Sequence, residues 1–188
     1  MGKFDWFWKA MGSTAERNNK KSKAVVADAH GLIGELSLLD DASLASAVAS
    51  TVRDGAIADK PRFLAGLSVA SQRTLGMTPF EVQNQAVLRL LEGDVIQMAT
   101  GEGKTLVGAM AATGFALQGK RVHLITVNNY LAARDAEWMR PLVEFFGLTV
   151  AAVTESSTRE ERVSAYRSDV IYAPVTEIGF DHLRDNQI

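Results

Sequence analysis

The chain has 188 residues, of which 47% are hydrophobic and 22% are charged, and its net charge is −2. This size allows one domain, or one domain with an appendage, around a sizeable core. The chain has no cysteine and no long uncharged apolar run, which excludes disulfides, thiolate metal sites and a membrane-spanning helix.

The N-terminal residues are basic and amphipathic. Residues 1–25 contain six basic and two acidic residues, a net charge of +4 that leaves −6 for residues 26–188. Four apolar residues recur at the spacing of one helix face, namely Phe4, Phe7, Trp8 and Met11. A helix of this kind binds at a membrane interface or docks on its own protein, and both interpretations stay open.

The region that follows is predicted to be mostly helical. Residues 12–23 are polar and predict a linker or a frayed helix, whereas residues 24–76 predict a helical lead-in. Asp40 caps a predicted helix over residues 42–52, and Pro61 suits the first turn of another helix. No pattern in this region indicates catalytic chemistry.

From residue 77 the predicted elements alternate between helices and short β-branched strands. A capping box at residues 78–81 starts the first of these helices. The predicted strands cover residues 95–98, 122–127, 148–153 and 170–173. The other predicted helices cover residues 106–117 and 132–146, and a further one starts at a second capping box over residues 158–161. The pattern predicts an α/β fold with a parallel sheet covered by helices, in which ligands bind at the carboxyl ends of the strands.

The sequence Met-Ala-Thr-Gly-Glu-Gly-Lys-Thr at residues 98–105 predicts a phosphate-binding loop between a strand and a helix. Its glycines let backbone N–H groups point at phosphate oxygens, its lysine places a positive charge there, and its threonine offers a hydroxyl to Mg²⁺. The candidate nucleotide-binding residues of the loop are Gly101, Glu102, Gly103, Lys104 and Thr105. Met98 replaces the first glycine of the common pattern, which is typical of the helicase-like, RecA-like branch of P-loop ATPases.

Four motifs occur in order between residues 76 and 188: Gly76–Gln83, Met98–Thr105, Thr126–Trp138 and Gly179–Asn186. In sequence and spacing they resemble SecA, the preprotein-translocase ATPase of bacteria. The third and fourth motifs are the ones that single out this family, because a phosphate loop alone indicates only a P-loop ATPase. Residues 32–75 resemble the leading helices of SecA more loosely.

The resemblance implies ATP and Mg²⁺ as ligands and assigns roles to further residues. Gln83 matches the glutamine that reads adenine, Phe80 would pack near the base, and Thr105 would help to hold Mg²⁺. Arg134 and Asp135 match a motif that couples nucleotide state to domain movement. Without the resemblance, Gln83 is predicted to be a solvated helix residue, and the Arg134–Asp135 pair a local ion pair on a solvated helix face.

The resemblance also implies partners and a place in the cell. It implies the Sec translocon channel and preproteins as partners and a cytoplasmic protein held peripherally at the inner face of the cell membrane. Independently of the resemblance, the aromatic face and the net charge of +4 of residues 1–25 predict that anionic lipids bind the N-terminus. A homodimer is also compatible. The family's usual residues are replaced at Ala99, Asn129 and residues 174–176. With these replacements the chain resembles an accessory SecA paralogue, one that exports a restricted set of proteins.

Residues 77–188 are predicted to form the first part of a nucleotide-binding domain, an incomplete motor domain. No apolar strand ending in Asp-Glu follows the loop, so the catalytic acid is unknown and we expect weak nucleotide binding and little hydrolysis from these residues alone. Two alternatives are a helicase-type nucleic-acid motor and a non-catalytic nucleotide-binding module. The acidic body argues against nucleic acid as a partner.

Overall fold

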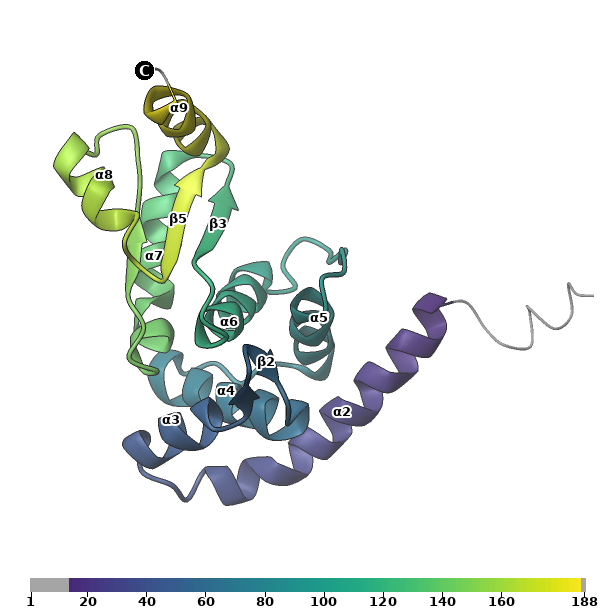
Figure 1. Ribbon diagram of the computed structural model, residues 1–188. Helices are drawn as coiled ribbons and strands as arrows, with labels where there is room; N and C mark the ends of the chain where they lie inside the picture. Colours follow the sequence, from purple (N-terminus) through teal and green to yellow (C-terminus); the bar gives the residue numbers. More distant parts are fainter. Residues whose placement is uncertain (1–13, 187–188) are drawn as a thin grey trace, which may run out of the picture.

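The computed structural model describes residues 14–186. A helical N-terminal region is followed by alternating helices and parallel strands (Figure 1). The amphipathic face predicted within residues 1–11 lies outside the described residues. Within residues 14–186, no helix combines the length and the apolar character needed to cross a membrane.

Four helices form the N-terminal region: α2 (Thr14–Leu36), α3 (Asp41–Ala49), α4 (Lys60–Leu75) and α5 (Glu81–Leu91). The long helix α2 packs along α4 and α5, and it places Val26 and Ala29 in the core. Helix α2 runs without a break through residues 14–23, so of the two alternatives predicted for this polar segment, linker or helix, the helix is the one that forms there.

The predicted helix over residues 42–52 is shorter than expected. Asp40 caps α3 as predicted, because its side chain accepts a hydrogen bond from the Ser43 N–H at 2.7 Å. The helix ends at Ala49, and two short antiparallel strands follow, β1 (Val52–Arg53) and β2 (Ala56–Ile57). Asp54 and Gly55 connect them with φ angles of 51° and 72°, the conformation that an Asp-Gly hairpin turn requires.

Helix α5 begins two residues later than the first capping box predicts. Its N-cap is Phe80, whose N–H donates to the Gln83 side chain at 2.9 Å. The Thr78 hydroxyl instead contacts the side chain of Gln72 on α4. The contact with α4 therefore removes Thr78 from the capping role that local sequence favours.

The remaining elements form the α/β part: α6 (Lys104–Leu117), β3 (Val122–Thr126), α7 (Asn129–Glu144), β4 (Val150–Ala152), α8 (Arg159–Ala165), β5 (Val170–Pro174) and α9 (Val175–Asp185). The three strands are parallel in the order β3-β5-β4, and Val170 pairs with both Val122 and Val150. The predicted parallel sheet is confirmed, and three of its four predicted strands, those at residues 122–127, 148–153 and 170–173, form within one or two residues of the predicted bounds.

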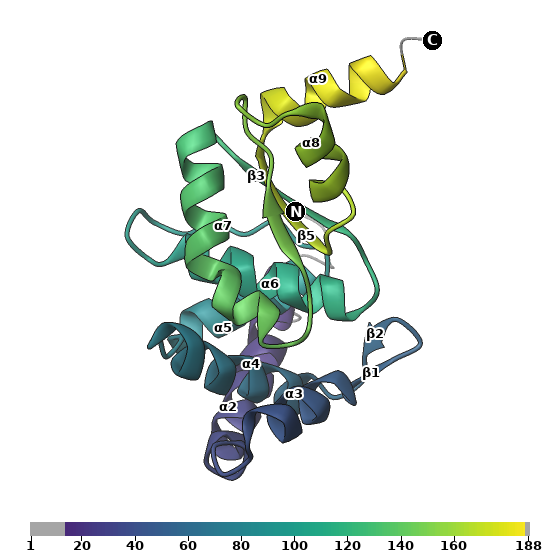
Figure 2. The same cartoon turned by 90° about the vertical axis from the view of Figure 1, so that its left-hand side faces the viewer.

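Helices cover both faces of the sheet (Figure 2). Val170 and Tyr172 of β5 point into the main core, which continues through α6 and α7 to α2 and α4. Ile171 and Ala173 point the other way, into a smaller core with Ala165 of α8. Because both faces are covered, every residue of β5 is buried, as expected of a central parallel strand.

The strand predicted at residues 95–98 is not formed. The segment is irregular, and Val95 is 99% exposed. A strand needs a neighbour to share its backbone hydrogen bonds, and this segment pairs with no strand within residues 14–186. The β-branched residues that favour a strand here therefore have no partner in the described part of the chain.

Candidate functional site

The phosphate loop, residues 98–105, leads into the first turn of α6, at the chain's crossing from α5 to α6 (Figure 1). Gly101 and Gly103 turn its backbone with φ angles of 87° and 77°, where a residue with a side chain is strained. A Cβ at Gly103 would also lie 2.3 Å from Nε2 of Gln83. The turn therefore favours glycine at position 103, and a side chain there would also displace the Gln83 amide from its present position.

Lys104 is the first residue of α6, and its ammonium group remains in the loop. Its Nζ donates hydrogen bonds to the carbonyl oxygens of Ala99 at 2.8 Å and Met98 at 3.1 Å. An ammonium group has three donors, so one is left for a phosphate oxygen. The N-terminus of α6 adds partial positive charge beside it, and together they make the loop favourable for an anion.

Gln83 connects the start of α5 to the phosphate loop. Its Oε1 accepts from the Phe80 N–H, and its Nε2 donates to the carbonyl of Glu102 at 2.8 Å. The side chain is 6% exposed, so the interpretation of Gln83 as a solvated helix residue is wrong. Each end of the amide keeps one free hydrogen-bonding position, which leaves the predicted contact with adenine chemically open.

Phe80 and Thr105 lie at the two ends of this arrangement. The Phe80 ring is 71% exposed at the N-terminus of α5, and Thr105 is half-buried in the first turn of α6. Within residues 14–186, no cluster of three acidic or histidine side chains could hold a metal ion. A Mg²⁺ ion at Thr105 would therefore take most of its oxygen ligands from phosphate and water, which Mg²⁺ commonly does.

Arg134 and Asp135 on α7 form a local ion pair, as their sequence predicts. Arg134 donates from Nε and Nη2 to Oδ1 of Asp135 at 2.8 and 2.6 Å, and this hydrogen bonding raises the pKa of Arg134. Asp135 is 8% exposed and faces the core side of the helix. The pair is thus only half on a solvated face, because its acidic member is buried.

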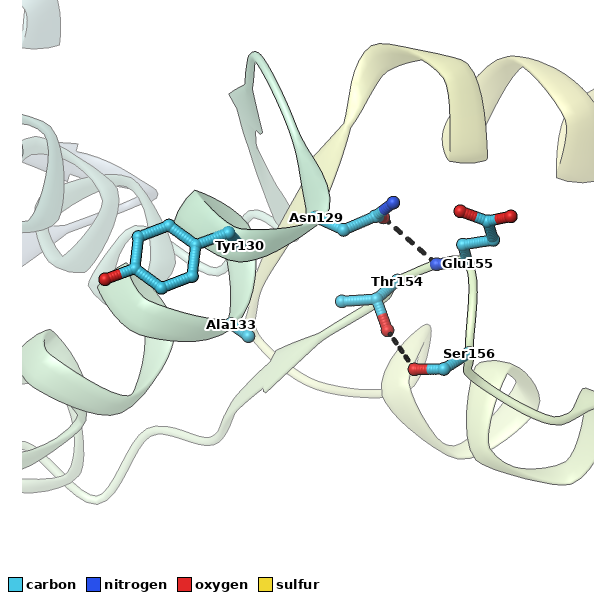
Figure 3. A pocket seen from close by; sticks show the side chains of 6 residues that line it. All are labelled: Asn129, Tyr130, Ala133, Thr154, Glu155 and Ser156. Atoms are coloured by element: carbon cyan, nitrogen blue, oxygen red, sulfur yellow. Dashed lines mark hydrogen bonds between the residues drawn. The ribbon is translucent and has the colours of Figure 1, made fainter.

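A hollow that the sequence did not reveal lies at the carboxyl ends of β3 and β4 (Figure 3). It has a volume of about 640 Å³ and is lined by Asn129, Tyr130, Ala133, Thr154, Glu155 and Ser156. The Asn129 side chain accepts from the Glu155 N–H at 3.0 Å and so ties α7 to the loop after β4. A sequence signal existed, since both segments directly follow parallel strands.

A buried ionic cluster connects α8 and α9. Arg162 donates to Glu177 at 2.7 Å and to Asp181 at 2.8 Å, and all three residues are 8% exposed. Asp181 also accepts from the Tyr166 hydroxyl at 2.8 Å and from Arg184 at 2.9 Å. Its carboxylate is fully engaged in this cluster and is therefore a structural group in this arrangement.

Comparisons with known proteins agree with the α/β fold. The SecA DEAD-like domain family matches residues 7–188. The protein translocase subunit SecA 2 of Corynebacterium efficiens is 62% identical over the whole chain, and that of Corynebacterium diphtheriae is 57% identical. Protein translocase subunit SecA 3 of Mycolicibacterium vanbaalenii is 50% identical over 97% of the chain.

The chain spans about a quarter of the length of these relatives, 25% for both Corynebacterium proteins and 23% for the Mycolicibacterium protein. The family match nevertheless includes the phosphate loop, the sheet and the helices on both of its faces. With nearly every residue matched by the family, the chain belongs to the SecA family.

Proposed function

We propose that this chain binds ATP at the phosphate loop as part of a SecA-type ATPase that drives preprotein export. The observation that carries the proposal is the loop itself. Gly101 and Gly103 turn its backbone in the left-handed conformation, and the Lys104 ammonium group lies within the loop. A hydrogen bond from Gln83 connects the loop to the start of α5. This arrangement combines the backbone donors, the cation and the helix terminus that a chain of phosphates needs.

In this proposal each residue has a distinct role. The backbone of Gly101–Thr105, including Glu102, binds the phosphates, and Lys104 stabilises their charge. The Thr105 hydroxyl helps to hold Mg²⁺, which when bound neutralises phosphate charge. Gln83 and Phe80 bind the adenine. Hydrolysis would depend on positioning and electrostatics, with no covalent intermediate.

The wider function rests on the relatives. Those proteins carry the names protein translocase subunit SecA 2 and SecA 3. The names support preproteins and the Sec translocon channel as partners and a cytoplasmic position at the membrane. The names SecA 2 and SecA 3 also support the interpretation that this chain belongs to an accessory SecA paralogue. A homodimer is part of the same proposal. A nucleic-acid motor is less favoured, because residues 26–188 carry a net charge of −6.

A comparison of stimulated hydrolysis tests this function. The full-length protein is assayed for phosphate release alone, with RNA, and with a translocation-competent preprotein and vesicles that contain the Sec channel. We expect stimulation by the preprotein and channel together. Stimulation by RNA alone would contradict the export function and favour the helicase alternative, and no hydrolysis under any condition would favour the non-catalytic module.

We also propose that the basic N-terminal segment binds anionic lipids. Lys20, Lys21 and Lys23 are all exposed on α2, whereas Ser22 and Val26 face the core. Each basic residue near an anionic surface contributes about 1 kcal/mol. Replacing the three lysines with glutamine should abolish most binding to anionic vesicles in flotation assays. Lys120→Gln is the matched control, and equal binding of the triple variant would contradict the proposal.

A further inference from the structure

Three polar groups of Glu102, one carboxylate oxygen, the N–H and the carbonyl, are hydrogen-bonded within the phosphate loop or to Gln83, which supports it. The carboxylate accepts from the Ala99 N–H at 2.6 Å, and the Glu102 N–H donates to the Ala99 carbonyl at 3.4 Å. The Glu102 carbonyl accepts from Gln83 at 2.8 Å. Glu102 therefore closes the turn through its side chain as well as through its backbone.

The Glu102 carboxylate and the Lys104 ammonium hold the same residue from opposite sides. Glu102 bonds to the N–H of Ala99, and Lys104 bonds to its carbonyl at 2.8 Å. No other charged side chain occurs within residues 98–105. Glu102 also has no ion pair with a basic side chain in the described part of the chain. The side chains of the loop thus carry no net charge, although the loop faces an anionic ligand in the proposed function.

We propose that Glu102 determines how the loop discriminates between nucleotides by their phosphate charge. Its hydrogen bond to Ala99 braces the loop, while its negative charge repels the bound phosphates. The repulsion grows with the charge of the ligand, so it acts more strongly on a triphosphate than on a diphosphate. Glu102 therefore shifts the preference of the loop toward the diphosphate. This inference rests on the proposed binding of ATP.

Two substitutions separate the brace from the charge. Glu102→Gln retains an oxygen that can accept from the Ala99 N–H but removes the negative charge. Calorimetric titration of the full-length protein should show ATP binding that is tighter by roughly threefold to tenfold, with a smaller gain for ADP. The gain should shrink in 1 M salt, because the side chain is exposed and salt screens such charges.

Glu102→Ala removes both the charge and the brace, so its ATP affinity should fall below that of Glu102→Gln. Glu160→Gln is the matched control, because Glu160 is an exposed glutamate in the first turn of α8, and its affinities should equal those of the unmodified protein. Melting temperatures establish that each variant is folded.

The outcomes distinguish this inference from the proposed function. If the unmodified protein binds ATP but Glu102→Gln leaves the ratio of ATP to ADP affinity unchanged, or weakens binding of both, the role of Glu102 is overturned and ATP binding stands. If the unmodified protein binds neither nucleotide, the proposed function fails and this inference fails with it.

Discussion

The phosphate loop and the Arg162 cluster both bring positive and negative side chains together, but they do so in opposite surroundings. Lys104 and Glu102 are exposed, and they hydrogen-bond to backbone groups of their own loop. Arg162, Glu177 and Asp181 are buried, and they bond to one another across two helices. The loop therefore keeps charges within reach of a ligand, whereas the cluster uses its charges to join α8 to α9.

The difference indicates which charged residues serve binding and which serve stability. An exposed charge costs little to hold, so it can exchange a backbone partner for a phosphate. A buried charge loses its hydration, and removing its partner leaves an uncompensated charge in the interior. We therefore expect substitutions in the loop to change ligand affinity and substitutions in the cluster to change the free energy of unfolding.

The largest expected effect is that of Arg162→Ala. It leaves the carboxylates of Glu177 and Asp181 buried without their main counter-charge, and such a loss typically costs about 3–5 kcal/mol. Urea denaturation followed by circular dichroism measures the change. Arg167→Ala is the matched control, because Arg167 is an exposed arginine just after α8 and its removal should cost little. If Arg162→Ala lowers the free energy of unfolding by less than about 1 kcal/mol, the cluster contributes no more than an exposed ion pair, and the contrast with the loop is wrong.

Gln83→Ala tests whether a buried residue can also affect ligand binding, because Gln83 is buried and its side chain hydrogen-bonds to the phosphate loop. The substitution leaves the Glu102 carbonyl and the Phe80 N–H without their partner, and each lost partner typically costs about 1–3 kcal/mol. We expect weaker ATP binding and poorer discrimination against GTP by calorimetry. Unchanged affinity for both nucleotides would show that Gln83 supports neither the loop nor the base.

Tyr166→Phe has the smallest expected effect. It removes the hydroxyl that donates to Asp181, while Arg162 and Arg184 still satisfy that carboxylate, so the loss should be about 1 kcal/mol. Burial, and then the contact with Asp181, raise the pKa of Tyr166 above its usual value. The stabilisation is therefore complete below about pH 10 and is lost at higher pH. Equal stability of variant and parent at pH 7 would contradict this role.

The phosphate loop and the sheet could be predicted from sequence because their signals are local. The turn depends on residues close together in the sequence, the glycines at 101 and 103 and the lysine at 104. The capping box at Thr158 also forms as predicted, with Thr158 and Glu161 bonded to each other's backbone N–H groups. In these places local hydrogen bonding and the tertiary structure favour the same conformation.

Helix α9 could not be predicted because its amphipathic pattern is inverted. Glu177 and Asp181 are 8% exposed, whereas Phe180 and Leu183 are 55% and 57% exposed. The usual rule places apolar residues inside, and only the presence of Arg162 on a neighbouring helix makes burial of the two carboxylates favourable. The hollow at the carboxyl ends of β3 and β4 was missed for a related reason, because Asn129 and Glu155 come together only when β3 and β4 join one sheet.

The central claim is that the loop at residues 98–105 binds nucleotide, and Lys104→Ala tests it most directly. Calorimetric titration of ATP into the full-length protein should show at least a tenfold loss of affinity, about 1.4 kcal/mol, because the substitution removes the loop's only basic side chain. Lys120→Ala, which removes another exposed lysine, should bind ATP like the parent. Melting temperatures without nucleotide establish that both variants are folded. Equal ATP affinity in Lys104→Ala and the parent would contradict the account.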